Sequence, residues 1–253
     1  MKNSIFLFFK GLLIGIGKII PGVSGSLIAI MLNVYEKSIY CISNLCKDFK
    51  KSFTFLFPLG IGIITSIYFG TGIIYILLKK YYSISMAFII GTLVGIVPEM
   101  WKKNPPKKIV DFVFVFIPIF IILFIYKLKI SCHNLLILGI VEAISMILPG
   151  ISGTAIYLLL DSYDLILSLY INPVSFSFFL FIISVLLTFL LLCKILNYLI
   201  KNYHHLINIT LSSFTTFSIF SLIMTYFKNI SLFHFSYLFI FFFGFLISYL
   251  FNR

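Results

Sequence analysis

Two short strings decide the fold: PGVSG at residues 21–25 and PGISG at residues 149–153. Each interrupts a long apolar stretch, residues 4–34 in the first case and residues 135–160 in the second. Proline removes a backbone hydrogen-bond donor and clashes with the preceding helical turn, while glycine permits dihedral angles that other residues avoid. We therefore expect each stretch to form a broken helix that turns back on itself inside the protein.

The two strings belong to an internal repeat. A shift of 128 residues aligns residues 11–36 with residues 139–164, and the identities continue beyond the strings to Tyr35 and Tyr163. An acidic residue follows each of these tyrosines. An apolar composition alone does not produce a shared Pro-Gly-x-Ser-Gly string with a Tyr-acid pair at the same distance. We therefore predict two structural repeats.

The composition excludes a soluble globular protein. Hydrophobic residues make up 61% of the 253 residues and charged residues 10%, whereas soluble domains carry about 25% charged residues. Such a chain has too few polar groups to cover an aqueous surface, and it is too apolar to be disordered. We predict an all-α, polytopic integral membrane protein.

Six segments approach the length of about 20 apolar residues that a helix needs to cross a bilayer. They are about residues 53–78, 81–98, 109–126, 175–193, 206–227 and 230–251. Three lie between the two strings and three follow the second, so the two broken helices enter the membrane from opposite faces. We predict two inverted-topology repeats, each a re-entrant hairpin plus three transmembrane helices, at residues 1–128 and 129–253. Together they form one membrane domain.

Lysine dominates the charges. The chain has 19 Lys+Arg against 7 Asp+Glu and a net charge of +12. Because the lysines fall between the apolar segments, they indicate membrane topology and attraction to anionic lipids, and we expect no nucleic-acid partner. In the re-entrant arrangement most of them lie on one face, which the positive-inside rule makes cytoplasmic. Both termini are predicted on that face, and the sequence sets no oligomeric state.

The two breaks are the candidate binding site. A helix that begins inside a membrane presents unpaired N–H groups and the positive end of its dipole, which attract anions. Serine hydroxyls there cap the helix or contact a ligand, and glycine lets a ligand approach the backbone. The candidate substrate-binding residues are Lys18, Pro21, Gly22, Ser24, Gly25, Ser26, Pro149, Gly150, Ser152, Gly153 and Thr154. The alternative is a pair of structural kinks without a ligand.

Two charged residues lie within the apolar arms. Lys18 precedes the first break and Glu142 the second, and a charge at this depth is costly unless it is paired or hydrated. We interpret Lys18 as the partner of an anionic head group and Glu142 as the candidate for coupling to protons or sodium. A structural pair between Lys18 and Glu142 is the alternative. We expect no metal and no other cofactor.

Other polar residues carry weaker signals. Tyr35 and Tyr163 are expected to be interfacial anchors. His204 and His205 are expected to be a solvated pair, because no further metal ligands accompany them in the sequence. The chain has no Ser/His/Asp or Cys/His arrangement and no pair of carboxylates suited to hydrolysis, so we predict that it is not an enzyme.

The chain resembles the bacterial polyprenyl-phosphate transporters over nearly its whole length. The resemblance rests on Lys10-Gly11, Gly15, both Pro-Gly-x-Ser-Gly strings, Leu148, Tyr35-Glu36, Tyr163, Gly91, Gly95 and Pro98. It implies translocation of undecaprenyl phosphate across the bacterial cytoplasmic (inner) membrane, which recycles this lipid carrier for cell-envelope glycan synthesis. Members of the family usually carry an acidic residue at the position of Lys18, and Gly-Gly-Thr at the position of Gly25-Ser26-Leu27. Glu142 is therefore the remaining candidate for ion coupling.

Three functions fit the sequence. The leading hypothesis is a flippase whose partners are the polyprenyl-phosphate lipid and the bilayer. The second is a secondary transporter of a small soluble anion, and the third is a membrane assembly factor that transports nothing. A lipid substrate needs a lateral opening between helices, whereas a soluble substrate needs a closed cavity.

Overall fold

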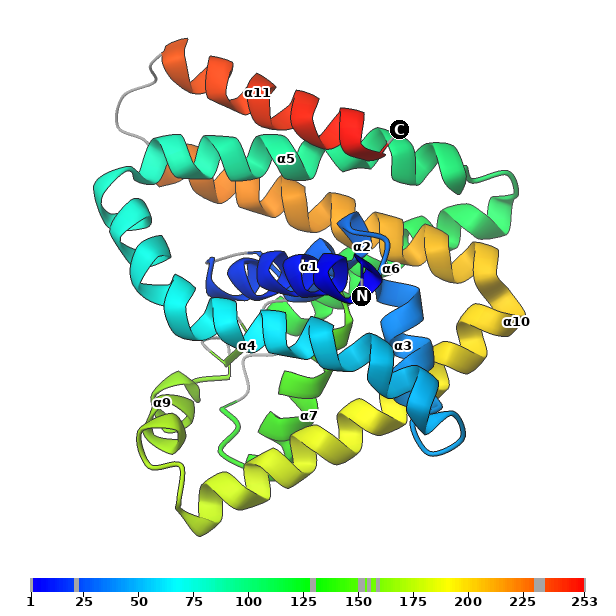
Figure 1. Ribbon diagram of the computed structural model, residues 1–253, viewed down its shortest axis with the longest axis vertical. Helices are drawn as coiled ribbons and strands as arrows, with labels where there is room; N and C mark the ends of the chain where they lie inside the picture. Colours follow the sequence, from blue (N-terminus) through cyan, green and yellow to red (C-terminus); the bar gives the residue numbers. More distant parts are fainter. Residues whose placement is uncertain are drawn as a thin grey trace.

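The computed structural model describes residues 2–20, 23–127, 131–149, 153, 156–157, 160–229 and 235–252. Within these ranges every regular element is an α-helix (Figure 1). The helices are α1 (Lys2–Ile19), α2 (Gly25–Met31), α3 (Tyr35–Ser43), α4 (Phe49–Lys80), α5 (Tyr82–Lys103), α6 (Ile109–Lys127), α7 (Leu135–Ile147), α9 (Tyr163–Ile171), α10 (Phe176–Asn229) and α11 (Phe235–Asn252). The prediction of an all-α protein is confirmed for the described residues.

Three of the described helices are long and apolar enough to cross a membrane. They are Phe49–Lys80, Tyr82–Lys103 and, within α10, Phe176–Phe227. Shorter apolar helices cover Ile109–Ile121, Leu135–Ile147 and Tyr237–Leu250. Large apolar side chains such as Phe120 and Leu187 are exposed on the outer faces of these helices, where lipid rather than water is the suitable solvent. The chain is therefore an all-helical membrane protein.

Two helical bends give the molecule its outline. Helices α4 and α5 meet at Tyr81, whose backbone angles are φ −131° and ψ 42°. Helix α10 bends at Tyr203, whose angles are nearly the same at φ −132° and ψ 39°. Each bend turns the chain into a V, and the two V shapes point toward opposite sides of the molecule (Figure 1).

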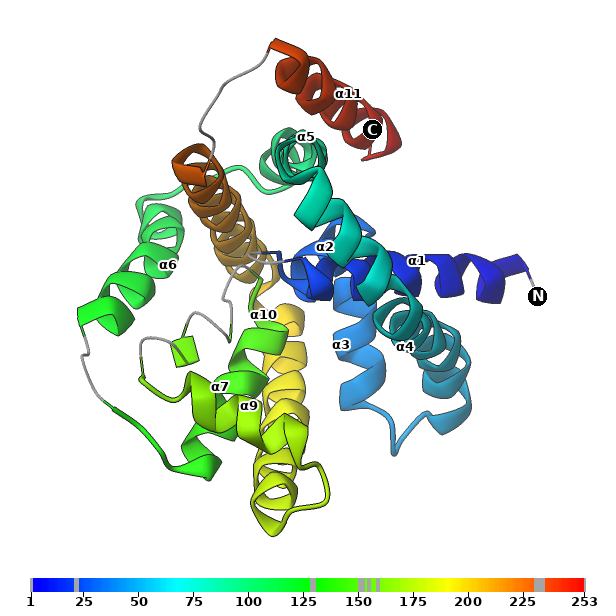
Figure 2. The same ribbon diagram turned by 90° about the vertical axis from the view of Figure 1, so that its left-hand side faces the viewer.

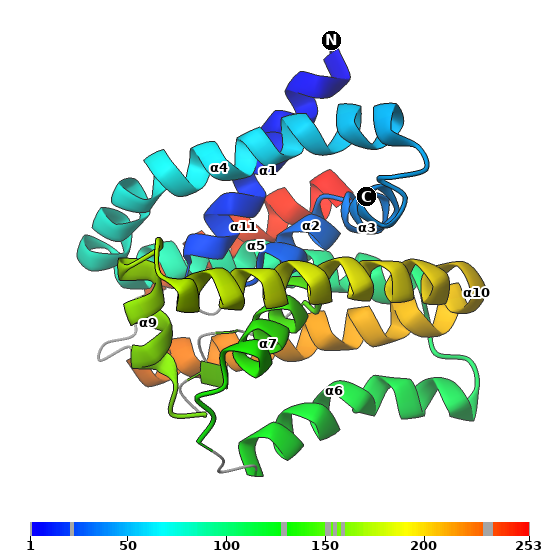
Figure 3. The ribbon, with the colours of Figure 1, turned by 90° about the horizontal axis from the view of Figure 1, so that it is seen from below.

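Helix α2 lies at the centre of the structure. Leu27 is 1% exposed and packs in a core cluster with Leu93 of α5 and with Ile219 and Leu222 of the second arm of α10. Helix α6, in contrast, lies at the edge of the molecule, where it contacts α10 (Figures 2 and 3). The short helix that follows the first break is thus surrounded by the longer ones.

The chain doubles back at the first break. The ammonium group of Lys10 on α1 donates a hydrogen bond of 2.8 Å to the carbonyl oxygen of Leu32, which directly follows α2. A Cβ atom added at Gly17 would lie 2.5 Å from Cγ1 of Ile28, so α2 packs closely along the last turns of α1. Helices α1 and α2 therefore form an antiparallel hairpin.

The same reversal occurs at the second break. The backbone N–H of Cys132, ahead of α7, donates to the carbonyl oxygen of Leu160 at 3.0 Å. The hydroxyl of Tyr157 donates to the carbonyl oxygen of Leu138 on α7 at 3.1 Å. The described part of the return arm therefore runs back along α7.

Corresponding elements of the two halves lie 128 residues apart. Helices α1 and α7 end at Ile19 and Ile147, and α3 and α9 are both nine residues long and begin at Tyr35 and Tyr163. Two residues other than glycine have a positive φ among the described residues, Asn33 at 53° and Asp161 at 51°, and they occupy equivalent positions. The left-handed conformation is unusual for such residues, so its occurrence at both positions indicates the same turn in both halves.

Candidate functional site

The first half of the candidate site is the start of α2. Ser24 occupies the N-cap position with extended backbone angles, φ −104° and ψ 137°, but its side chain makes no capping hydrogen bond. Its hydroxyl lies 2.6 Å from the hydroxyl of the buried Ser26 instead. The first-turn N–H groups of α2 are therefore not satisfied by Ser24. The predicted residues Pro21 and Gly22 lie outside the described residues.

Lys18 joins this half of the site. It lies in the last turn of α1, and a Cβ atom added at Gly25 would lie 3.0 Å from Lys18 Cγ. The stem of Lys18 therefore runs against the first residue of α2. Its side chain is exposed, and it forms no ion pair or hydrogen bond with any residue in the described part of the chain. The structure thus places the stem of Lys18 against the turn that carries Ser24 and Ser26.

The second half of the candidate site contains Glu142 and Tyr157. The Tyr157 hydroxyl lies 3.0 Å from Glu142 Oε2, so its one proton is shared between this oxygen and the carbonyl oxygen of Leu138. A Cβ atom added at Gly153 would lie 2.6 Å from the same oxygen and 2.8 Å from the hydroxyl of Ser145, so a larger residue would displace the carboxylate. Pro149, next to the break, is fully buried. The predicted residues Gly150, Ser152 and Thr154 lie outside the described residues.

Lys18 and Glu142 belong to different hairpins and form no ion pair with each other. The alternative of a structural pair between them is therefore wrong in this conformation. The first hairpin carries cations, Lys10 and Lys18, and the second carries a carboxylate that is bonded to a tyrosine. Lys18 and Glu142 thus give the two halves opposite charges near their turns, whereas Lys10 lies at the other end of the first hairpin.

Tyr35 connects the two halves. It is 5% exposed, and its hydroxyl donates a hydrogen bond of 2.9 Å to the carbonyl oxygen of Ile147, the last residue of α7. The expectation of an interfacial anchor is therefore wrong for Tyr35, because helix packing buries it against the second hairpin. Tyr163 is partly exposed at the start of α9 and remains compatible with an interfacial position.

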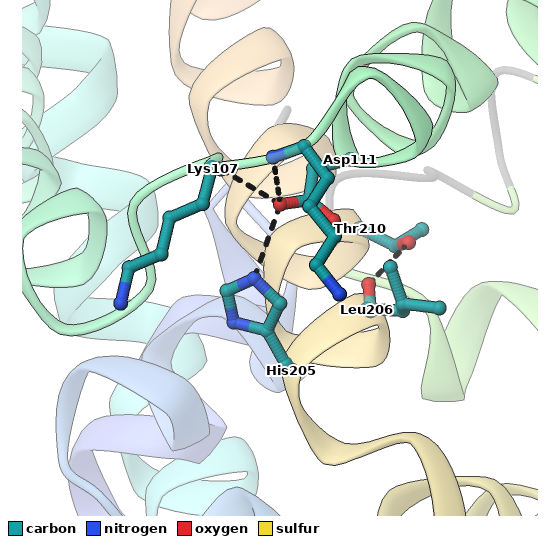
Figure 4. A network of polar contacts seen from close by, with 6 residues as sticks. Lys107, Asp111, His205, Leu206 and Thr210 are labelled. Carbon is teal, nitrogen blue, oxygen red and sulfur yellow. Dashed lines mark hydrogen bonds and ion pairs between the residues drawn. The ribbon is translucent and has the colours of Figure 1, made fainter.

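Both histidines are exposed at the bend of α10, as expected for a solvated pair, and each of them also contacts a carboxylate. Nε2 of His204 lies 3.5 Å from Glu36 Oε2, and Nε2 of His205 lies 3.2 Å from Asp111 Oδ2. Asp111 is buried and accepts the backbone N–H groups of Lys107 at 2.7 Å and Lys108 at 3.0 Å (Figure 4). These contacts tie α3 and the start of α6 to the bend.

Sequence reasoning missed Asp111, Glu36 and Tyr157 as parts of this polar framework. The available signal was the small number of acidic residues. The chain has only 7 of them, and an acidic residue in an apolar helix needs a partner. The partners themselves lie far away in sequence, which made them invisible to local patterns. Among the described residues no group of three or more His, Cys, Asp or Glu side chains is placed to hold a metal ion.

The fold and the site together define an all-helical membrane protein in which the turn between α1 and α2 and the end of α7 carry polar groups within an apolar body. Residues 14–233 match the family described as VCA0040-like, undecaprenyl phosphate translocase-like, and the chain belongs to this family. The match includes both Pro-Gly-x-Ser-Gly strings.

Two curated relatives have the same name, polyprenyl-phosphate transporter. The chain is 28% identical over 228 residues to the protein from Vibrio cholerae serotype O1, an alignment that covers 79% of this chain and 71% of the relative. It is 29% identical over 163 residues to the protein from Staphylococcus aureus, covering 57% of this chain and 58% of the relative. No solved structure is significantly similar.

Proposed function

We propose that the protein translocates polyprenyl phosphate, in particular undecaprenyl phosphate, across the bacterial cytoplasmic membrane and so recycles the lipid carrier of cell-envelope glycan synthesis. The observation that carries this proposal is the family match across residues 14–233, which spans both hairpins. The names of the two relatives agree with it. In this function the protein is a transporter and not an enzyme, and its partners are the lipid and the bilayer.

The proposed architecture is a pair of inverted repeats, residues 1–128 and 129–253, each with a re-entrant hairpin. The repeat is supported by features that recur 128 residues apart. These are the ends of α1 and α7, the starts of α3 and α9, and the positive φ angles of Asn33 and Asp161. The V of α4 and α5 and the V of α10 point in opposite directions, which supports the inversion (Figure 1). In such transporters, broken helices meet near the bilayer midplane and the two repeats rock around the site.

The proposed orientation has both termini in the cytoplasm. The loop between α5 and α6 holds Lys107 and Lys108, and α5 ends at Lys103. Lysines are enriched in short cytoplasmic loops, which supports placing this end of the bundle, with the bend of α10, on the cytoplasmic side.

The phosphate is proposed to bind between the two turns while the prenyl tail stays in lipid. Lys18 supplies a positive charge, and Ser24, Gly25 and Ser26 supply hydroxyl and backbone donors. The residues proposed to contribute from the second turn are Pro149, Gly150, Ser152, Gly153 and Thr154. Glu142, which faces Gly153 and Tyr157, is the proposed coupling group for protons or sodium.

Movement of a labelled polyprenyl phosphate in proteoliposomes tests this function. Ser24→Leu fills the first turn with an apolar side chain and is expected to abolish transport, whereas Ser168→Leu on the exposed face of α9 is a matched control. Movement that Ser24→Leu stops and Ser168→Leu spares supports the proposal. Uptake of a soluble phosphate ester without lipid movement would favour a small-anion transporter, and neither activity in folded protein would favour an assembly factor.

A further inference from the structure

A polar cavity lies beside the hairpins, at the bend of α10. Its volume is about 560 Å³, and it is lined by the end of α2, the start of α3, the end of α5 and α10 after the bend. Its polar lining includes Lys37, Glu99, Lys103, His204, Asn208 and Ser212. In a chain with 10% charged residues, this is an unusual concentration of charge within one enclosure.

Ser212 contributes a hydroxyl group to the lining of the cavity. Ser212 as a whole is 2% exposed, and its hydroxyl forms no hydrogen bond with any residue that the structure describes. Neighbouring hydroxyls on α10 do have partners: Thr215 donates to the carbonyl oxygen of Leu211 at 2.8 Å, and Thr216 donates to that of Ser212 at 2.8 Å. The Ser212 hydroxyl is thus free to bond to a group that enters the cavity.

The side chains of His204 and Lys103 in the cavity are held only loosely. Nε2 of His204 lies 3.5 Å from a carboxylate oxygen of Glu36, and Nζ of Lys103 lies 3.6 Å from one of Glu99. The side chains of Lys103 and His204 are more than half exposed, and exposed ion pairs of this kind contribute little. A ligand with a higher negative charge than a carboxylate displaces such partners, because it gains more from the same donors.

Lys37 adds a further positive charge. Its ammonium group lies 4.6 Å from the centre of the Phe55 ring and forms no ion pair within the described ranges. Asn208 contributes an amide that lies within 3.4 Å of the His204 ring. Beside the carboxylates of Glu36 and Glu99, the cavity therefore offers cationic and neutral donors together, the combination that recognises a phosphate monoester.

The cavity lies one short helix away from the proposed binding turn. Ser24 precedes α2 and Ile30, near its other end, lines the cavity, so the two are about 9 Å apart along the helix axis. The start of α2 packs against Ile219, which lies two helical turns beyond Ser212 on α10. Helices α2 and α10 thus both extend from the turn to the cavity.

We propose that this cavity is a second phosphate site, at which the head group pauses between the Ser24 turn and the aqueous face of the membrane. The proposal rests on the proposed transport of polyprenyl phosphate and adds a site that the sequence does not indicate. Lys37, Lys103 and His204 bind the phosphate oxygens, and Ser212 and Asn208 supply neutral donors. When the phosphate leaves, His204 returns to Glu36 and Lys103 returns to Glu99, which keeps the site weak enough for release.

The single tryptophan of the chain reports on this site. Trp101 follows Met100, which lines the cavity, and its Nε1 donates a hydrogen bond of 3.0 Å to Thr216, one turn beyond Ser212. Fluorescence of Trp101 in detergent-solubilised full-length protein is titrated with a short-chain polyprenyl phosphate and, separately, with inorganic phosphate. Three variants are compared with the unsubstituted protein. One is the double variant Lys37→Gln/Lys103→Gln, and the second is Ser212→Ala. The third is the control double variant Lys47→Gln/Lys50→Gln, which removes two exposed lysines elsewhere.

The lipid phosphate is expected to cause a saturable change in fluorescence. The lipid concentration at half-saturation is expected to rise about tenfold in the Lys37/Lys103 variant, and it is also expected to rise in Ser212→Ala. The control pair is expected to leave it unchanged. Saturation by inorganic phosphate alone would assign the cavity to free phosphate and overturn the lipid assignment. An unchanged fluorescence together with an unchanged KM for transport in the Lys37/Lys103 variant would overturn the second site. Transport by the unsubstituted protein in the same preparation shows separately whether the proposed function stands.

Discussion

The hydroxyl of Tyr35 donates a hydrogen bond of 2.9 Å to the carbonyl oxygen of Ile147, which lies 112 positions further along the chain. Tyr35 begins α3, directly after the first hairpin, and Ile147 ends α7, directly before the second break. Both residues are buried. This bond therefore holds the second turn in a fixed position relative to the first, and the geometry of a site made from both turns depends on it.

Removal of this bond is expected to lower both the stability of the protein and its rate of transport. Tyr35→Phe leaves the Ile147 carbonyl buried without its donor, which lowers the free energy of unfolding by about 1–3 kcal/mol. Thermal unfolding in detergent measures this loss, and transport at saturating lipid measures the effect on the site. Tyr68→Phe removes a hydroxyl that is 78% exposed on α4 and is expected to change neither. Equal behaviour of the two variants would show that the Tyr35 bond holds nothing in place.

Close helix packing leads to a second prediction. Helix α1 lies against α4 so closely that a Cβ atom at Gly62 would be 2.2 Å from the carbonyl oxygen of Phe8, whereas a Cβ atom at Gly60 would meet nothing within 4 Å. Gly62→Ala is therefore expected to force the helices apart and to lower the free energy of unfolding by about 2 kcal/mol or more. Gly60→Ala, two residues away, is expected to be neutral or slightly stabilising. Thermal unfolding of the two variants in the same detergent compares them, and a similar loss in both would contradict the packing.

The sequence alone predicted the parts of the fold that depend on local chemistry. The Pro-Gly strings end α1 at Ile19 and α7 at Ile147, because proline and glycine act within one or two turns of their own position. The repeat spacing anticipated the matching starts of α3 and α9. Lys18 lies against Gly25 at the first turn, because only a few residues separate the two, and its role in binding stays a prediction.

The parts that were missed depend on packing between distant helices. The bends at Tyr81 and Tyr203 fall at the boundaries between expected segments, but neither contains a proline or glycine that would set the angle between its two arms. A tyrosine at the end of an apolar stretch has the same local pattern whether it lies at a membrane interface or is buried like Tyr35. The pairing of His205 with Asp111 joins residues 94 positions apart, and only the folded arrangement brings them together.

Asp111 leads to a third prediction. Its carboxylate accepts the backbone N–H groups of Lys107 and Lys108 at the start of α6, and His205 bonds to the same oxygen. Asp111→Ala removes all three contacts and is expected to lower the melting temperature by about 3 °C. Asp48→Ala is the matched control, because Asp48 occupies the N-cap of α4 without a side-chain capping bond. Differential scanning fluorimetry compares the two, and an equal shift would show that the network around Asp111 adds nothing to stability.

Glu142 gives the last prediction, which concerns the driving force for transport. Glu142→Gln keeps the size of the side chain and an acceptor for the Tyr157 hydroxyl, but it removes the negative charge that takes up a proton or binds sodium. Transport by this variant is expected to fall to the rate that the unsubstituted protein shows without a proton or sodium gradient, and to respond to neither gradient. Asp164→Asn, an exposed carboxylate on α9, is expected to respond normally. Proteoliposomes with imposed gradients measure both variants. A gradient response that survives in Glu142→Gln would move the coupling group to another residue, because the structure around position 142 is otherwise preserved.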